Sequence, residues 1–146
     1  MRTQRTLGKR VLLISPDRDL KHQVHACLST AGIAATTLTT ARSSEEGLVA
    51  VARIRPRLVI LDDSATDLDG PGLLRALRQN DPAALIVYLT VFHSLELERT
   101  VRQSGVLYYT EKPPDSSLLV KLLAAVFAPL LQQAAVSPRS QLTRPR

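Results

Sequence analysis

The sequence is poor in cysteine and aromatic residues and contains no long hydrophobic run. Its one cysteine, Cys27, excludes an internal disulfide and favours a reducing environment. No apolar stretch approaches the roughly 20 residues that span a bilayer, and the apolar run after the basic N-terminus, Val11–Ile14, is too short for a secretory signal. With two Phe, three Tyr and no Trp in 146 residues, the core is expected to consist of Leu, Val and Ala. These absences predict one cytoplasmic domain without a membrane segment.

Motifs of independent enzymes are also missing. The chain has no glycine-rich phosphate loop and no Ser-His-Asp arrangement, and Cys27 lacks the context of a nucleophile. His22 and His25 have no Cys or acidic residue at ligand spacing, so we interpret them as surface histidines. We expect His93 to lie in a solvated loop and the protein not to be an enzyme.

The net charge of +6 is concentrated at the two ends of the chain. Seven of the 19 basic residues lie before residue 11 or after residue 136, whereas all 13 acidic residues lie between them, so the body is nearly neutral. Basic ends attract nucleic acid without specificity. Nucleic-acid association through the termini is therefore an alternative, but solvated tails are the preferred interpretation.

Apolar runs and helical periodicities alternate five times along the chain. Strands are predicted over residues 11–14, 33–38, 58–62, 85–90 and 106–110. Helices are predicted over 19–31, from the capping pattern at 43–46 up to Pro56, after Asp69-Gly70-Pro71, over 95–103, and after Pro113-Pro114-Asp115. This order predicts an α/β fold with a parallel sheet and right-handed crossovers.

Four polar residues fall at the carboxyl ends of these predicted strands: Ser15, Asp62, Thr90 and Lys112. In open parallel sheets, sites form outside these ends. The apolar strand Leu58–Asp62 delivers one carboxylate to that edge, so Asp62 is the anchor of the predicted site.

The chain resembles the receiver domain of two-component response regulators. The motifs that carry the resemblance together are Asp62 followed by Asp69-Gly70, then Thr90, then Tyr109-x-x-Lys112-Pro113. The resemblance covers Arg10 to about Phe127. It implies a flavodoxin-like (βα)5 doubly wound sheet with strand order 2-1-3-4-5. The domain would span residues 10–133, between a basic extension (1–9) and a disordered basic tail (134–146).

The resemblance also implies a role for each matching residue. Asp62 corresponds to the phosphoacceptor, Lys112 to its cationic partner, Thr90 to the hydroxyl donor for the phosphoryl group, and Tyr109 to the switch aromatic. Mg²⁺ would be held by Asp62, by the backbone carbonyl of Ser64 and by an acid at the end of the first strand. The Lys112–Pro113 peptide bond is expected to be cis.

Ser15-Pro16 stands where the family places its acidic pair. Mg²⁺ binds chiefly through carboxylate oxygens, and phosphoryl transfer depends on that metal. Asp17 follows at once, but we interpret it as a helix cap and only secondarily as a replacement Mg²⁺ ligand. Asp63 is a second departure, since an apolar residue usually follows the phosphoacceptor, and it is expected to face solvent or to supply a substitute carboxylate. Thr66, where proline is common, is a third.

Two functions remain open from the sequence. The first is a stand-alone, degenerate receiver (a pseudo-receiver) that acts by protein contact with impaired or absent Mg²⁺-dependent phosphorylation. The second is a working phosphoacceptor, modified on Asp62 by a histidine kinase or relay protein. The family's partner face corresponds to about Ser94 to Phe127, where Tyr108, Tyr109 and the apolar last helix favour pairing, including homodimerisation.

Overall fold

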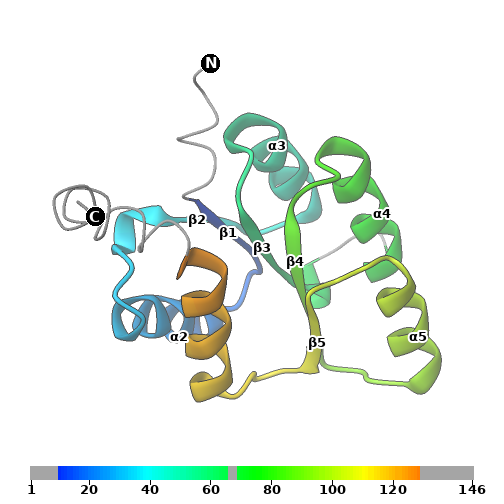
Figure 1. The fold of residues 1–146 in the computed structure, drawn as a ribbon. Coiled ribbons are helices and arrows are strands. Elements are labelled where there is room, and N and C mark those ends of the chain that lie inside the picture. The colour runs from blue at the N-terminus through cyan, green and yellow to red at the C-terminus, as the bar shows by residue number, and fades with distance from the viewer. Residues whose placement is uncertain (1–9, 66–68, 129–146) are drawn as a thin grey trace, which may run out of the picture.

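The chain folds around a parallel five-stranded sheet. The computed structural model describes residues 10–65 and 69–128 (Figure 1). The strand order is β2-β1-β3-β4-β5, as the sequence predicts. The strands are β1 (Val11–Ile14), β2 (Leu38–Ala41), β3 (Leu58–Asp62), β4 (Leu85–Thr90) and β5 (Tyr108–Glu111).

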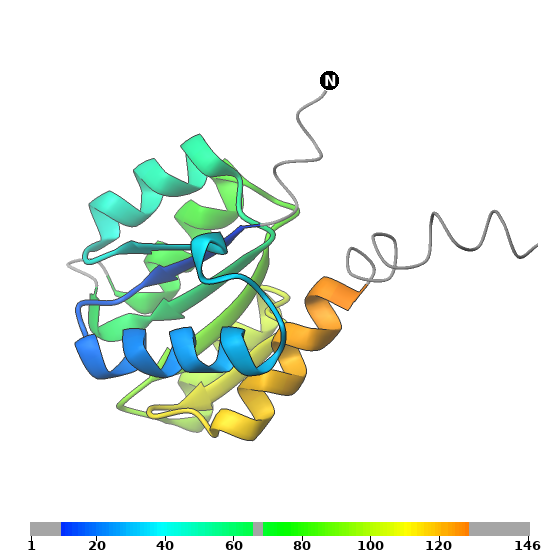
Figure 2. The same cartoon turned by 90° about the vertical axis from the view of Figure 1, so that its left-hand side faces the viewer.

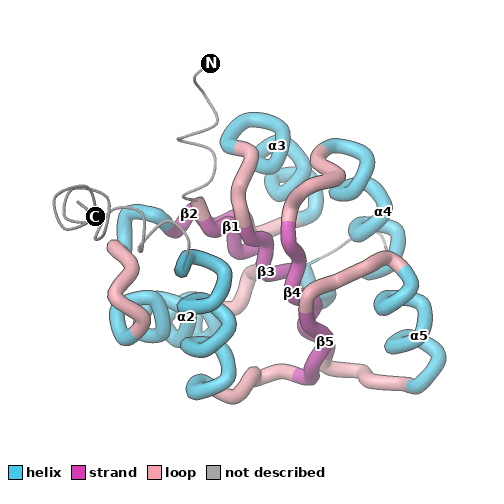
Figure 3. The backbone as a smooth tube through the Cα atoms, viewed as in Figure 1, coloured by secondary structure: helices cyan, strands magenta, loops and turns pink. Residues whose placement is uncertain are grey.

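Helices cover both faces of the sheet, which runs through the centre of the molecule (Figure 3). On one face lie α2 (Arg18–Thr30) and a last helix over residues 116–128; on the other lie α3 (Ser44–Ile54), α4 (Gly70–Asn80) and α5 (Leu95–Gln103), as Figures 1 and 2 show. The apolar residues consequently form two cores, one on each side of the sheet. The central strands β1 and β3 are buried along their whole length, as expected for strands covered on both faces.

The helix starts follow the predicted capping residues. Asp17 caps α2 by accepting the backbone N–H groups of Asp19 and Leu20, and Ser43 caps α3 by accepting that of Glu46. Asp69 caps α4, with Pro71 in its first turn. These local signals were sufficient to place the helices along the chain.

Two predicted strands are shifted in the structure. Residues 33–38 were expected to form the second strand, but Ala35–Thr37 form a 3₁₀ turn and β2 is Leu38–Ala41. The reason is that Ile33 is still tied to the end of α2, because its N–H donates to the carbonyl of Leu28. The fifth strand was expected over 106–110 and instead runs from Tyr108 to Glu111.

Some predictions concern residues outside the described part of the chain. They are the basic extension over 1–9, the loop residue Thr66, the last residues of the domain up to 133, and the basic tail over 134–146. Within residues 10–65 and 69–128, no helix is both long and apolar enough to cross a membrane.

Candidate functional site

The parallel sheet brings the predicted site residues to one edge. Asp62 and Thr90 are the last residues of β3 and β4, Ser15 follows β1, and Lys112 follows β5. Because all five strands run in the same direction, their carboxyl ends lie together, and Asp62 contacts both Ser15 and Lys112. Asp62, Thr90 and Ser15 are buried.

The carboxylate of Asp62 is fully buried and is satisfied on both oxygens. Its Oδ2 accepts hydrogen bonds from the Ser15 hydroxyl at 2.6 Å and from the Lys112 ammonium at 2.8 Å. Its Oδ1 accepts from the backbone N–H of Ser64 at 3.0 Å and from the Ser64 hydroxyl at 2.7 Å. Burial of a carboxylate is tolerated when it is paired and hydrogen-bonded, and here all four donors come from the protein.

Lys112 joins two carboxylates. Its Nζ lies 2.8 Å from Asp62 Oδ2 and 3.0 Å from Asp17 Oδ2. Burial alone lowers the pKa of Lys112, but its hydrogen bonds to Asp62 and Asp17 outweigh burial, so the pKa is raised above the ordinary value. The same bond to Lys112 lowers the pKa of Asp17. Asp17 is therefore both the helix cap and the second counter-charge of Lys112.

The donor set at this edge does not fit Mg²⁺. A magnesium site needs several oxygen ligands with free lone pairs in octahedral geometry. In this structure both oxygens of Asp62 already accept hydrogen bonds from protein donors, and the Asp17 carboxylate is engaged by Lys112 and by the N–H groups of α2. No group of three or more His, Cys, Asp or Glu side chains able to hold a metal occurs in the described residues.

One of the two expectations for Asp63 was that it faces solvent, but its side chain is partly buried. Its Oδ2 accepts a hydrogen bond from the hydroxyl of Tyr88 at 3.0 Å, on the side of the sheet covered by α4. Tyr88 is fully buried. Its hydroxyl occupies the space in which a Cβ atom of Gly70 would lie, so glycine is required at the start of α4. Sequence reasoning missed this arrangement, since nothing local connects residues 63, 70 and 88.

Asp63 is expected to make stability fall as the pH rises above 3.8, the ordinary pKa of its carboxyl group. Burial raises the pKa of Asp63, while hydrogen bonds from Thr90 and Tyr88 lower it in part. Between the unfolded and the folded pKa, the folded state therefore holds a proton that the unfolded state has lost. The contribution of Asp63 to stability is fully present below the unfolded pKa and is lost as the pH rises through the folded pKa.

We expect Asp63→Asn, whose amide oxygen can still accept from Tyr88, to remove this loss. The measurement is the free energy of unfolding by urea between pH 3.5 and 7 for both proteins, roughly the window set by the carboxyl pKa values. The gap between the curves should grow in favour of the variant as the pH rises. Parallel curves would contradict the assignment.

The predicted switch aromatic, Tyr109, is buried within the described structure. Its ring stacks on that of Tyr88 with centroids 5.8 Å apart, and its hydroxyl lies 2.9 Å from Nδ1 of His93. The guanidinium of Arg102 lies 5.9 Å from the ring centroid. His93 lies in the exposed loop after β4, as expected, and its Nδ1 also contacts the hydroxyl of this buried tyrosine.

Thr90 is buried beside this group. Its hydroxyl oxygen accepts the backbone N–H of Phe92 at 3.1 Å, which fixes the start of the loop between β4 and α5. The Lys112–Pro113 peptide bond is cis, the form that the resemblance implies.

The fold and the edge just described define a class: doubly wound α/β domains with a buried aspartate at the end of the third strand, opposite a lysine that follows the fifth. The chain matches the response regulator receiver domain over residues 11–124 and belongs to that family. The family assignment agrees with the resemblance drawn from the sequence.

The sequence identity to individual relatives is low. The chain is 26% identical over 137 residues to the nitrogen assimilation regulatory protein NtrX of Azorhizobium caulinodans, covering 92% of this chain and 30% of that protein. The receiver domain of NtrX from Brucella abortus matches with a TM-score of 0.68 and 24% identity, covering 81% of this chain and 98% of that one. The beryllofluoride-activated NtrC4 receiver domain dimer matches with a TM-score of 0.72 and 20% identity, over 82% and 97% of the two chains. These structures support the fold. The chain spans about a third or less of the length of the curated relatives it matches.

Proposed function

We propose that this receiver domain takes part in two-component signal transduction through protein contact, with impaired or absent Mg²⁺-dependent phosphorylation of Asp62. The observation that carries the proposal is the hydrogen bond of 2.6 Å from the Ser15 hydroxyl to Asp62 Oδ2. Ser15 stands where the family has an acidic residue, and it donates to the carboxylate instead of helping to bind a metal. The proposal includes a cytoplasmic location.

The charges at the site support this proposal. Two carboxylates, Asp62 and Asp17, share one ammonium group, and Ser15 and Ser64 supply the remaining hydrogen bonds. With a third and a fourth carboxylate, the site would carry excess negative charge and would require a divalent cation. With Ser15-Pro16, two carboxylates face one ammonium group, so the site carries only about one excess negative charge and has less need of a divalent cation.

A second candidate function is that of a working phosphoacceptor, which a histidine kinase or relay protein modifies on Asp62. The retained contact between Lys112 and Asp62 favours it. Lys112 still contacts Asp62 at 2.8 Å, and Thr90 is buried at the end of the adjacent strand. In this candidate Asp62 is the nucleophile, and Lys112 and Thr90 bind the phosphoryl oxygens. Asp62, the Ser64 carbonyl and Asp17 would be the residues that hold Mg²⁺, which would neutralise the developing charge.

Labelling distinguishes the two candidates. We expect the protein with acetyl phosphate and Mg²⁺ to show well under one phosphoryl group per chain by intact-mass measurement, because the metal that neutralises the developing charge is poorly held. Ser15→Asp/Pro16→Asp should bind Mg²⁺ at least about tenfold more tightly, since charged ligands dominate the affinity of hard cations.

Asp62→Asn in the double-aspartate background is the control, and it should abolish any labelling gained. Stoichiometric, Mg²⁺-dependent labelling of the parent at Asp62 would overturn the proposal in favour of the phosphoacceptor.

The partner face is proposed to centre on α5 and the loop before it. The apolar side chains of the last helix that were expected there are turned inward: Leu119, Leu123 and Phe127 are buried. Tyr109 is also buried, so it cannot itself contact a partner in this conformation. The large apolar side chains exposed nearby are Phe92 at 84%, Leu95 at 74% and Val91 at 45%. We propose that a signalling protein, or a second copy of the chain, contacts these residues.

A further inference from the structure

A pocket lies next to Asp62, on the side of the sheet edge where α2 begins. It has a volume of about 270 Å³ and is lined by Ser15, Pro16, Asp17, Arg18, Lys21, His22, Thr40 and Arg42. Three of these side chains, Arg18, Lys21 and Arg42, are cationic and exposed, and they come from α2 and from the residue after β2. The body of the protein is nearly neutral, so a local group of cations is a specific feature of this edge.

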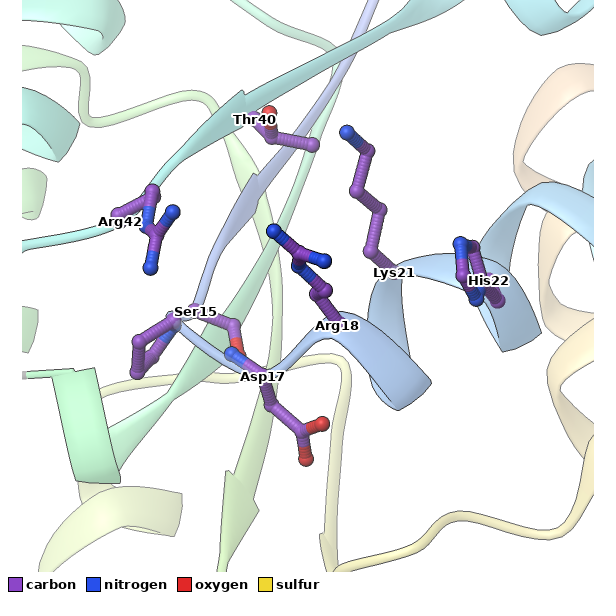
Figure 4. Close-up of a pocket in the computed structure, with 8 residues that line it drawn as sticks. Ser15, Asp17, Arg18, Lys21, His22, Thr40 and Arg42 are labelled. Carbon is purple, nitrogen blue, oxygen red and sulfur yellow. The ribbon is translucent and has the colours of Figure 1, made fainter.

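The cations have no counter-charge in the described part of the chain. No carboxylate there forms an ion pair with Arg18, Lys21 or Arg42. The acid that lines the pocket, Asp17, directs its carboxylate away from these cations (Figure 4), toward Lys112 at 3.0 Å. Glu46 accepts the backbone N–H of Arg42 rather than its guanidinium.

The positions of the charged groups of Arg18, Lys21 and Arg42 favour binding of one shared ligand. In Figure 4 the guanidinium of Arg18 and the ammonium of Lys21 extend from α2 toward β2, where Thr40 and Arg42 lie. Like charges held on one concave surface repel one another, and an anion bound between them removes that repulsion. Guanidinium groups match phosphate oxygens in geometry as well as in charge.

We infer that this pocket binds a compact phosphate-bearing anion, such as a diphosphate or a sugar phosphate. The volume lies just below the roughly 300–1,000 Å³ of most small-molecule sites, which suits a small polar anion rather than a dinucleotide. Ser15 and Asp17 belong both to this pocket and to the hydrogen-bond network of Asp62 and Lys112. A bound anion therefore contacts the same segment that replaces the acidic pair. The inference does not depend on whether Asp62 is phosphorylated.

Isothermal titration of the full chain with inorganic diphosphate at low ionic strength tests the inference. We expect saturable binding to one site. Arg18→Gln/Arg42→Gln should weaken it about tenfold or more, because each lost charge-assisted hydrogen bond contributes strongly. Arg53→Gln/Arg99→Gln, which removes the same charge from exposed positions on α3 and α5, should change it less than about twofold. NMR shifts in the parent should concentrate at Ser15, Asp17 and Thr40.

Three results would overturn the inference: no saturable binding, equal weakening by both double variants, or binding only to phosphatidylglycerol vesicles or duplex DNA and not to soluble diphosphate. Stability provides an independent check. Relief of repulsion should leave the melting temperature of Arg18→Gln/Arg42→Gln equal to or above that of the parent. A drop of several degrees would mean that these residues serve the fold and would also overturn the inference.

Discussion

Gly70→Ala is expected to destabilise the domain by about 3 kcal/mol, one of the two largest effects that the structure predicts. A Cβ atom at this position would overlap the hydroxyl of Tyr88 and lie 2.9 Å from Cβ of Asp63. Overpacking of this kind costs about 1–3 kcal/mol, and breaking the Tyr88–Asp63 hydrogen bond leaves buried polar groups unpaired at a similar cost. Tyr88 cannot move aside easily, because it is fully buried and stacked on Tyr109. Urea denaturation measures the change.

A double-mutant cycle tests the proposed cause. Tyr88→Phe removes the atom that collides with the new methyl group, so it should restore at least about 1 kcal/mol in the Gly70→Ala background while destabilising the parent. Gly72→Ala is the matched control in the same helical turn. Its Cβ would meet Oδ1 of Asp69, the cap of α4, so we expect a loss of about 1 kcal/mol from the disturbed cap, which Tyr88→Phe should not restore. Additive losses at residues 70 and 88 would contradict the explanation.

Lys112→Met should destabilise the domain by about 3 kcal/mol. It keeps the length of the side chain but removes the positive charge beside Asp62, which is fully buried. Removing one partner of a buried ion pair costs about 3–5 kcal/mol, because the remaining charge is left uncompensated. We place the value at the lower end, since Ser15 and Ser64 still donate hydrogen bonds to the carboxylate.

Asp62→Asn provides the test of that explanation. In the Lys112→Met background it removes the stranded charge and should recover more than half of the loss, whereas in the parent it should destabilise. Lys121→Met, an exposed lysine on the last helix, is the control and should change the free energy of unfolding by less than about 0.5 kcal/mol. An equal loss with and without Asp62 would show that the lysine contributes by packing alone.

Much of the fold could be predicted because its signals are local. The apolar run that ends at Asp62 and the caps at Asp17, Ser43 and Asp69 all appear within a few residues of the elements they define. The second and fifth strands were placed less well. They are short and lie at the two edges of the sheet, so pairing with a single neighbour, rather than their own apolar pattern, fixes their bounds.

Contacts between distant residues could not be predicted in the same way. The Tyr88–Asp63 hydrogen bond, the His93–Tyr109 contact and the group formed by Arg18 and Arg42 each join separate elements. Sequence spacing carries no information about which side chain of one strand faces which residue of the next loop. For this reason the sequence left two alternatives open for Asp63, and it gave no sign that the exposed His93 contacts Tyr109.

The sequence by itself determined the class of fold and the convergence of Ser15, Asp62, Thr90 and Lys112, because the alternation of apolar patterns implies parallel strands, and the resemblance to receiver domains implies their order. It also showed that Ser15-Pro16 replaces an acidic pair. Only the tertiary structure decided what that replacement does. Ser15 lies close enough to donate to Asp62, Lys112 pairs with Asp17 as well, and the buried carboxylate is thereby satisfied by protein groups. The physical reason is that burial makes each unpaired lone pair costly, and only the folded arrangement determines which donors are within reach.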